Sequence, residues 1–208
     1  MSDLQDQFHP LSCPDKTSLN TIVLAGGRGS RVGFRQKALL PYQGKPILLS
    51  ILQTLKPQCQ TVWVNMNVEP EIYQPYCEAL FSDESSEFLG PLAGMHAAWH
   101  QLDTEWLVFV PCDNPHLPED FITRLISAYQ LNPAPLVVAD DGERIQPLYL
   151  LMHKSMSASL ASAIAKSHLS VYRWIEENDF SKADFSDCAP QAFQNLNTLE
   201  AFQAASSE

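Results

Sequence analysis

The sequence predicts an α/β fold in which helices cover both faces of a mostly parallel β-sheet that includes a small antiparallel hairpin. Two observations lead to this prediction. Apolar runs of strand length, rich in β-branched residues, alternate with segments whose apolar residues recur at helical spacing, and this alternation is typical of parallel sheets. In addition, Asp141-Gly142 lies between two apolar runs, which indicates a tight turn between antiparallel strands.

The individual elements follow from the same patterns. The expected strands lie at residues 21–25, 61–65, 78–81, 106–112, 135–140 and 146–152. Helical spacing predicts helices at residues 46–56, 70–80, 91–102 and 117–131. The last of these segments has Pro118 near its start, followed by two acidic residues, as the amino end of a helix prefers.

Length and composition predict one domain behind a short arm. A chain of 208 residues with 45% hydrophobic residues can bury about 70% of the surface of its unfolded form, which is enough for one sizeable core. The opening of the chain is polar and contains Pro10 and Pro14. We therefore expect a flexible N-terminal arm over residues 1–19 and a single domain over residues 20–208.

Three features bear on the compartment. The first twenty residues contain no apolar core of signal-peptide length, and no later run approaches the roughly 20 apolar residues of a membrane span. The five cysteines are widely spaced and include no C-x-x-C pair, which argues against a disulfide framework or a zinc knuckle. We therefore expect a cytoplasmic protein.

Positive charge is concentrated in one short segment of an acidic chain. Thirteen Lys and Arg against 24 Asp and Glu give a net charge of -11, which argues against binding to nucleic acid or to an anionic membrane. Four of the thirteen basic residues fall within ten positions, namely Arg28, Arg31, Arg35 and Lys37. This clustering predicts a local anion site.

The anion site coincides with a glycine-rich turn after the first expected strand, LAGGRGSRVG at residues 24–33. Its glycines let backbone N–H groups approach an anion closely, and the turn after the first strand of such a sheet usually carries phosphate. The glycine spacing of Gly27, Gly29 and Gly33 is one residue too long for the dinucleotide fingerprint. The Walker pattern fails because Pro46, rather than Ser or Thr, follows Gly44-Lys45. The turn is therefore a phosphate loop of another kind. The alternative is a plain glycine turn with solvated arginines.

A second informative position is Asp113, which follows the apolar run WLVFVPC. A carboxylate at the carboxyl end of a central strand faces the ligand crevice, where it can hold Mg²⁺ against a polyphosphate. The alternative is that Asp113 only stabilises the turn before Asn114-Pro115.

Taken together, these residues resemble the molybdenum cofactor guanylyltransferases, whose glycine motif runs L-A-G-G, three residues, R-M-G, two residues and K. Residues 24–27, residues 31–33 and Lys37 match this motif. Further similar segments follow in family order: Asn65 in VWVNMN, Asp83 in LFSDES, GPLAG at 90–94, PCDNP at 111–115, DGER at 141–144 and NLNT at 195–198. The resemblance covers nearly everything after residue 20.

The resemblance implies a three-layer Rossmann-like nucleotidyltransferase fold and a defined reaction. The reaction is transfer of GMP from Mg²⁺-GTP to the phosphate of molybdenum-loaded molybdopterin, which gives the guanine dinucleotide cofactor and pyrophosphate. The implied partners are GTP, Mo-molybdopterin and, at either end of the pathway, molybdenum-insertion proteins and apo-molybdoenzymes. Mg²⁺ is the expected cofactor.

The resemblance also implies roles for single residues. It assigns nucleotide binding to Leu24, Ala25, Gly26, Lys37 and Asp113. Gly27, Arg28, Asn65 and Asp83 are further expected nucleotide-binding residues, although Asp83 could equally be one acid of a solvated loop. Lys37, Arg31 and Asp113 are the expected catalytic residues, with Lys37 on the phosphates and Asp113 as the metal ligand. Charge and position suggest that Arg28 and Arg31 receive the departing pyrophosphate. Pterin contacts are expected at Arg144, Asn195 and Asn197, although a turn-capping role for the two asparagines remains open.

Some residues depart from the family pattern, and other functions stay open. Val32 replaces Met, Gln36 replaces an acidic residue before Lys37, and Gln146 replaces His. A cytidylyltransferase acting on the same pterin would share the loop and the metal carboxylate, but would favour L-A-A-G over L-A-G-G. A sugar-phosphate nucleotidyltransferase would usually be longer. A nucleotide-binding module without catalysis is the alternative from a different class.

Overall fold

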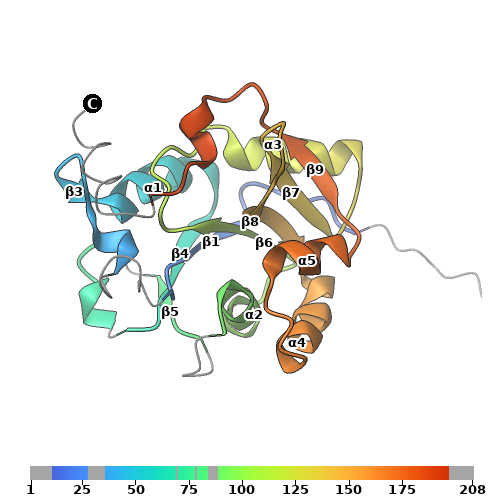
Figure 1. Cartoon of the computed structure of the whole chain (residues 1–208), viewed down its shortest axis with the longest axis horizontal. Coiled ribbons are helices and arrows are strands. Elements are labelled where there is room, and N and C mark those ends of the chain that lie inside the picture. The colour runs from blue at the N-terminus through green and yellow to red at the C-terminus, as the bar shows by residue number, and fades with distance from the viewer. Residues whose placement is uncertain (1–10, 28–35, 69, 78, 84–88, 197–208) are drawn as a thin grey trace, which may run out of the picture.

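The computed structural model describes residues 11–27, 36–68, 70–77, 79–83 and 89–196. Within these residues, one sheet of seven strands runs through the molecule, with helices on both faces (Figure 1). In spatial order its strands are β5 (Leu80–Phe81), β4 (Thr61–Asn65), β1 (Asn20–Leu24), β6 (Trp106–Pro111), β8 (Ile145–His153), β7 (Leu136–Asp140) and β9 (Ser181–Asp184). A separate ribbon pairs β2 (Pro41–Tyr42) with β3 (Lys45–Pro46).

Most neighbouring strands of the main sheet are parallel. β5, β4, β1 and β6 all run in one direction, and β9 runs parallel to β7 at the far edge. The exception is β8, which runs antiparallel to both of its neighbours, β6 and β7. β7 and β8 form a hairpin around the turn at Asp141 and Gly142. The predicted mostly parallel sheet with an antiparallel hairpin is therefore confirmed.

The helices form one layer on each face of the sheet. α1 and α3 cover one face, and α2, α4 and α5 cover the other (Figure 1). The α-helices are α1 (Ile47–Leu55), α2 (Pro91–Gln101), α3 (Phe121–Leu131), α4 (Ser157–Ala165) and α5 (Val171–Glu176). Short 3-10 turns are η2 (Lys37–Leu39), η3 (Lys56–Gln58), η4 (Pro70–Ile72), η5 (Lys154–Met156) and η6 (Pro190–Phe193).

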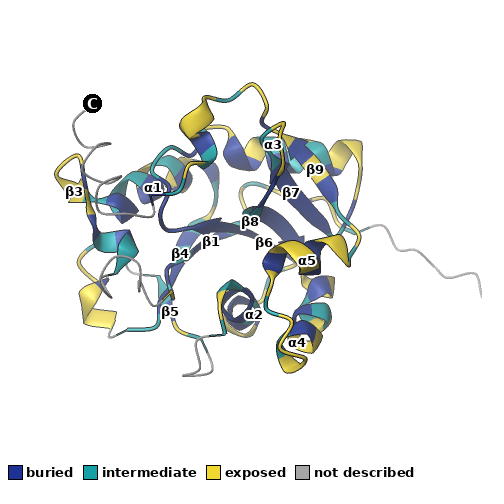
Figure 2. Cartoon of the chain, viewed as in Figure 1, coloured by how far each residue is buried: buried dark blue, intermediate teal, exposed yellow. Residues whose placement is uncertain are grey.

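Each face of the sheet has its own apolar core, because alternate residues of a strand point to opposite faces. On the first face, Val108 of β6 belongs to a cluster with Phe121 of α3. On the second face, Phe109 belongs to a cluster with Leu92 of α2 and Trp174 of α5. Figure 2 shows the result, a buried sheet between helices whose outer sides are exposed. This double burial explains why β6 reads as a continuous apolar run.

One predicted helix is wrong, and several elements were not predicted, among them the short ribbon of β2 and β3. Over residues 70–80, the described part of the chain forms η4, irregular turns and, at Leu80, the start of β5. Pro75 lies in this segment, and proline has no backbone N–H and clashes with the preceding helical turn. The unpredicted elements also include α4, α5 and β9. β9 has the sequence SKAD, which has low strand propensity, and it pairs with β7 because tertiary context overrides propensity.

The described part of the expected N-terminal arm lies against the domain. Tyr129 of α3 donates its hydroxyl to the Leu11 carbonyl at 2.7 Å, and Trp106 Nε1 donates to the Ser12 carbonyl at 2.8 Å. Residues 1–10 lie outside the described residues. The prediction of a flexible arm therefore stays a prediction, and the described residues 11–19 make these contacts.

Two further observations concern membrane-spanning helices and the cysteines. No helix among the described residues is long and apolar enough to span a membrane. All five cysteines are free. Cys77 and Cys112 are buried among the apolar side chains between the sheet and the α1 and α3 layer, where a thiol acts as a small apolar group.

Candidate active site

The carboxyl ends of three neighbouring parallel strands meet at one edge of the sheet. β1 ends at Leu24, which pairs in register with Asn65 of β4 on one side and with Pro111 of β6 on the other. The segments that follow these strands therefore lie side by side. Ligands of open α/β sheets bind at this edge, and two groups of polar residues lie there.

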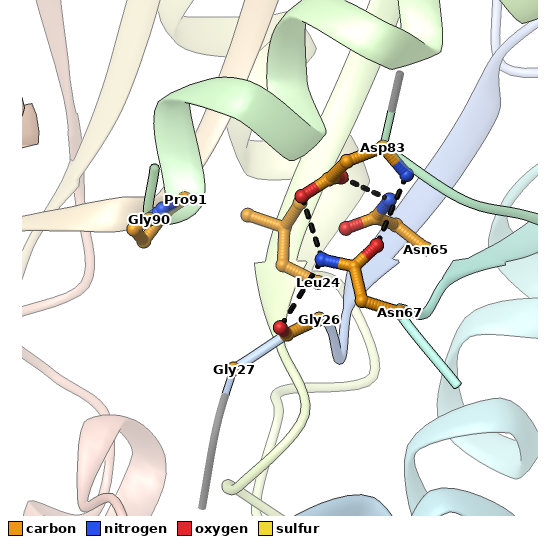
Figure 3. Close-up of a pocket in the computed structure, with 8 residues that line it drawn as sticks. All are labelled: Leu24, Gly26, Gly27, Asn65, Asn67, Asp83, Gly90 and Pro91. Atoms are coloured by element: carbon orange, nitrogen blue, oxygen red, sulfur yellow. Dashed lines mark hydrogen bonds between the residues drawn. The ribbon is translucent and has the colours of Figure 1, made fainter. Parts of the chain in front are cut away.

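The first group lines a cavity of about 350 Å³ at the ends of β1 and β4 (Figure 3). We call this cavity the nucleotide pocket, after the sequence-based prediction for its residues. Its lining residues are Leu24, Gly26, Gly27, Asn65, Asn67, Asp83, Gly90 and Pro91. Five of them belong to the predicted nucleotide site. A sixth predicted residue, Ala25, is buried beside the pocket and donates its N–H to the Asn65 carbonyl at 2.8 Å.

Asp83 is the centre of a hydrogen-bond network in the nucleotide pocket. Its Oδ1 accepts from Asn65 Nδ2 at 2.8 Å, and its Oδ2 accepts from Asn67 Nδ2 at 2.6 Å. Asn67 Nδ2 also donates to the Gly26 carbonyl at 3.2 Å. Figure 3 shows these groups turned toward one another at one wall of the pocket. The network joins the glycine turn after β1 to the segment after β5.

Three glycines permit this close packing. An added Cβ at Gly94 of α2 would lie 2.4 Å from Asn65 Oδ1, and one at Gly26 would lie 2.7 Å from Asn67 Nδ2. Gly90, just before α2, has a φ of 78°, a left-handed conformation that favours glycine. The two glycines of the GPLAG segment therefore have different physical reasons: Gly94 lets α2 approach Asn65, and Gly90 allows the left-handed turn before the helix.

The second group pairs Lys37 with Asp113 beyond the end of β6. Lys37 Nζ lies 3.2 Å from Asp113 Oδ2, and only 23% and 10% of the two side chains are exposed. Burial raises the pKa of the Asp113 carboxyl, while the nearby Lys37 ammonium opposes that rise. The two residues are 76 positions apart in sequence, so the fold alone brings together the two charges that the sequence assigned to the site.

The other oxygen of Asp113 has a bearing on metal binding. Asp113 Oδ1 is buried and has no hydrogen-bond partner among the described residues, which is an unfavourable state for a carboxylate oxygen. No group of three or more His, Cys, Asp or Glu in the described part of the chain could hold a metal ion by itself. Mg²⁺ is commonly held by one or two carboxylates together with substrate phosphates. The donor set therefore fits a metal ion shared with a phosphate ligand.

Gln36, the residue that departs from the family pattern before Lys37, also has a defined contact. Its Oε1 accepts from the hydroxyl of Tyr73 at 3.2 Å. Tyr73 is fully buried, and burial raises the pKa of its hydroxyl well above the usual range, so the hydroxyl stays protonated and donates. An amide oxygen replaces a carboxylate oxygen here, and the acceptor is retained without a charge.

A buried hydrogen-bond chain joins the Asp113 loop to the C-terminal part of the described residues. Asn114 Nδ2 donates to the Tyr149 hydroxyl at 3.0 Å, and that hydroxyl donates to Asn195 Oδ1 at 3.0 Å. The Leu196 N–H donates to the Asp113 carbonyl at 2.8 Å. Asn195, one of the expected pterin-binding residues, is therefore connected to the Asp113 loop through the Tyr149 hydroxyl and through its neighbour Leu196.

Arg144 lies exposed in the turn between β7 and β8. Its N–H donates to Asp141 Oδ1 at 2.9 Å, and Gln146 Nε2 donates to Asp141 Oδ2 at 2.6 Å. Because β8 runs antiparallel to β6, this turn lies at the same edge of the sheet as Asp113. Asp141 thus organises the turn that carries Arg144.

The structure leaves three predicted residues aside and adds one. Arg28, Arg31 and Asn197 lie outside the described residues. Asn67 was not predicted, although it lines the nucleotide pocket. Its position two residues after Asn65 was the available signal, because residues at that spacing in an extended segment point to the same side.

The family model and two curated relatives indicate the same family. Residues 21–182 match a family described as MobA-like NTP transferase domain. A molybdenum cofactor guanylyltransferase from Photobacterium profundum is 37% identical over 190 residues, which cover 91% of this chain and 96% of the relative. Another from Shewanella putrefaciens is 36% identical over 182 residues, 88% of this chain and 93% of the relative. The solved structure of molybdopterin-guanine dinucleotide biosynthesis protein A from Archaeoglobus fulgidus has a TM-score of 0.76 at 20% identity, covering 90% of this chain and 97% of that one.

Proposed function

The chain belongs to the molybdenum cofactor guanylyltransferase family, and from this premise we propose that it transfers GMP from GTP to the phosphate of molybdenum-loaded molybdopterin. The products are the guanine dinucleotide cofactor and pyrophosphate. The observation that carries the proposal is the partly buried Lys37 and Asp113 pair at the same sheet edge as the nucleotide pocket. Membership in a nucleotidyltransferase family and this pairing of charges both favour catalysis over a binding module.

The reaction asks the protein for alignment and charge neutralisation. The attacking group is a phosphate oxygen, which is substantially ionised near neutral pH because its second pKa is about 6. The protein therefore needs no nucleophile of its own, and its contribution is to orient the reactants and to stabilise the developing negative charge. In the proposed mechanism, the nucleotide pocket holds the nucleoside and Lys37 Nζ contacts the phosphates. Arg28 and Arg31 receive the pyrophosphate.

A divalent metal ion fits the chemistry of Asp113, and we propose that this ion is Mg²⁺. The buried Oδ1 supplies one oxygen ligand without giving up the contact of Oδ2 with Lys37. When bound, Mg²⁺ neutralises phosphate charge and polarises the phosphoryl group. Asp113 thus has two proposed tasks, which are to hold the ion through Oδ1 and to orient Lys37 through Oδ2.

We propose that the pterin binds at the part of this sheet edge that is formed by the Asp113 loop, Asn195 and the turn between β7 and β8. Asn195 is connected to the Asp113 loop by a hydrogen bond with the Tyr149 hydroxyl. Arg144 lies at the same edge of the sheet and is exposed, so its guanidinium can reach an anionic ligand. Asn197 belongs to this proposed group by its sequence position. We also propose that molybdenum-insertion proteins supply the substrate, that apo-molybdoenzymes receive the product, and that the reaction takes place in the cytoplasm.

The test is a product assay with several nucleotides. Purified protein is incubated with Mg²⁺, molybdenum-loaded molybdopterin and GTP, CTP, ATP or UTP, and both pyrophosphate and the dinucleotide product are measured. The protein should prefer GTP to CTP by much more than about tenfold. A site whose acceptor atoms pair with two guanine donors leaves those acceptors unpaired when cytosine enters. Equal use of CTP would favour the cytidylyl alternative. GTP binding without pyrophosphate release would favour the non-catalytic module.

A further inference from the structure

Asn67 contacts both halves of the nucleotide pocket at once. Its Nδ2 donates to the Gly26 carbonyl at 3.2 Å and to Asp83 Oδ2 at 2.6 Å, and its Oδ1 accepts from the Asp83 N–H at 3.0 Å (Figure 3). One amide group therefore fixes a carbonyl of the glycine turn together with the backbone and the carboxylate of Asp83.

Asp83 depends on this amide because the sheet ends just before it. β5 pairs with β4 over two residues only. The Met66 N–H still donates to the Phe81 carbonyl at 2.9 Å, and the next bond of a parallel ladder would join the Asp83 N–H to the Met66 carbonyl. The Asp83 N–H donates to Asn67 Oδ1 instead. The Asn67 side chain thus takes the place of a ladder partner.

The described residues use only part of the acceptor capacity of the Asp83 carboxylate. Among them, Oδ1 accepts from Asn65 and Oδ2 accepts from Asn67, and a carboxylate oxygen has two lone pairs. On each oxygen, one acceptor site is therefore not taken by a described residue. Two acceptors side by side fit two adjacent donors of a nucleoside, either N1–H and the 2-amino group of guanine or the 2′ and 3′ hydroxyls of ribose.

We propose that Asn67 is a positioning residue that orients the Asp83 carboxylate to accept a pair of adjacent donors from the nucleoside. This inference rests on the proposed function, because it takes GTP as the ligand. By holding Gly26 with the same amide, Asn67 also sets the distance between the carboxylate and the glycine turn. A side chain at Gly26 would disturb that distance, since its Cβ would lie 2.7 Å from Asn67 Nδ2.

The experiment measures nucleoside binding without pterin, by calorimetry. Asn67→Ala should weaken the binding of guanosine and of GTP by the same factor, about tenfold, and leave the binding of pyrophosphate unchanged. Asn67→Asp keeps the shape and the Oδ1 acceptor but loses the donors, so it should weaken binding at least as much. The matched control is Asn132→Ala at the exposed end of α3, which should bind guanosine as the wild type does.

Two analogues identify the donor pair. Inosine lacks the 2-amino group of guanosine, and 2′-deoxyguanosine lacks the 2′-hydroxyl. The wild type should discriminate against one of them, and Asn67→Ala should reduce that discrimination by about threefold or more, because the lost donor no longer meets an oriented acceptor. A loss of affinity for guanosine with both discriminations unchanged would overturn the proposal.

A double-mutant cycle separates positioning from simple destabilisation. In an Asp83→Asn background, Asn67→Ala should weaken guanosine binding by less than about twofold, because the carboxylate that Asn67 orients is already gone. An equal, about tenfold loss in both backgrounds would overturn the proposal. If Asn67→Ala does not fold, Asn67→Asp takes its place in the cycle. A wild type that does not bind GTP would count against the proposed function, whereas normal GTP binding by Asn67→Ala would count against this inference alone.

Discussion

Lys37 and Asp113 show at the residue scale how the site keeps charge where burial disfavours it. The pair is 3.2 Å apart, and both side chains are largely shielded from water. Burial raises the pKa of the Asp113 carboxyl despite the neighbouring ammonium. A carboxyl whose pKa is perturbed by burial next to a specific charge partner is characteristic of functional sites. The buried carboxylate therefore lowers the stability of the folded chain, and in the proposed function its charge holds the metal ion and orients Lys37.

The first prediction concerns Lys37→Ala. Loss of one preorganised charge partner of the phosphates should remove about 2 to 4 kcal/mol of transition-state stabilisation, measured as the change in kcat/KM for GTP. The fold should survive, because the side chain is partly exposed and sits on a 3-10 turn. Lys45→Ala, an exposed lysine of β3, is the control. Near-normal turnover in folded Lys37→Ala would refute the catalytic role.

The second prediction concerns the stability of Asp113→Asn. Since burial raises the pKa of Asp113 in the folded chain, the folded form binds a proton more readily than the unfolded form, and stability falls as the pH rises through the raised pKa. The neutral amide should therefore melt at a higher temperature than the wild type at pH 7. The difference should shrink as the pH falls toward the ordinary pKa of a carboxyl, and thermal unfolding at several pH values checks this.

The same variant, Asp113→Asn, also tests the proposed role of Mg²⁺. Mg²⁺ with GTP should stabilise the wild type more than GTP alone, because a ligand that binds only the folded state raises its stability. In Asp113→Asn this additional stabilisation should be largely lost, and so should turnover at ordinary Mg²⁺ concentrations. An unchanged Mg²⁺ dependence of turnover would reduce Asp113 to a turn residue.

Single residues of the site were predictable where a motif carries them. The glycine turn, Lys37 and Asp113 stand in segments whose residue types suggest their chemistry without a structure. Asn67 was not predicted, and its contacts with Gly26 and Asp83, which are 41 and 16 positions away, depend on the fold. The spacing of two residues from Asn65 indicates only that the two side chains point to the same side and does not reveal these partners.

At the scale of elements, the approach of α2 to the end of β4 shapes the nucleotide pocket. The helix brings Gly94 against Asn65, and Pro91 and Gly90 at its amino end line the cavity. Asn65 is only 2% exposed, so its amide is held between the helix and Asp83. The distance between α2 and the end of β4 therefore determines whether the Asn65 amide can donate to the Asp83 carboxylate.

The third prediction is that Gly94→Ala destabilises the protein. In an ordinary helix, alanine is favoured over glycine by roughly 1 kcal/mol. Here the new Cβ would lie 2.4 Å from Asn65 Oδ1, and overpacking costs about 1 to 3 kcal/mol. The thermal midpoint should fall and GTP should bind more weakly as Asn65 is displaced. Gln101→Ala at the exposed end of α2 is the control, and a higher midpoint for Gly94→Ala would contradict the packing argument.

The elements were predictable where local pattern and tertiary structure agree. The apolar run of β6 and the hairpin turn at Asp141 were both predicted and both confirmed. The segment at residues 70–80 has helical spacing, but Pro75 interrupts it, and Tyr73 turns inward to reach Gln36. β9 has no apolar signal and exists because β7 offers an edge for pairing. Such an element follows from the rest of the fold.

At the scale of the whole molecule, the site is assembled from distant parts of the chain. The α/β fold and the family were predicted from the sequence and are confirmed. The connection between the Asp113 loop and the C-terminal segment could not be predicted, because it runs through the hydroxyl of Tyr149, a residue of β8 that is only 2% exposed. Three segments, around residues 114, 149 and 195, meet in this one network.

The last prediction tests that network with Tyr149→Phe. Loss of the hydroxyl leaves Asn195 Oδ1 and one Asn114 donor contact without their partner, which should lower the free energy of unfolding by about 1 to 3 kcal/mol. If Asn195 belongs to the pterin site, the KM for molybdopterin should also rise while the KM for GTP stays unchanged. Tyr129→Phe is the matched control, because its hydroxyl donates to the Leu11 carbonyl, a contact that involves none of the proposed site residues. It should lower stability without changing either KM, and an equal change in both KM values for Tyr149→Phe would argue against a separate pterin side.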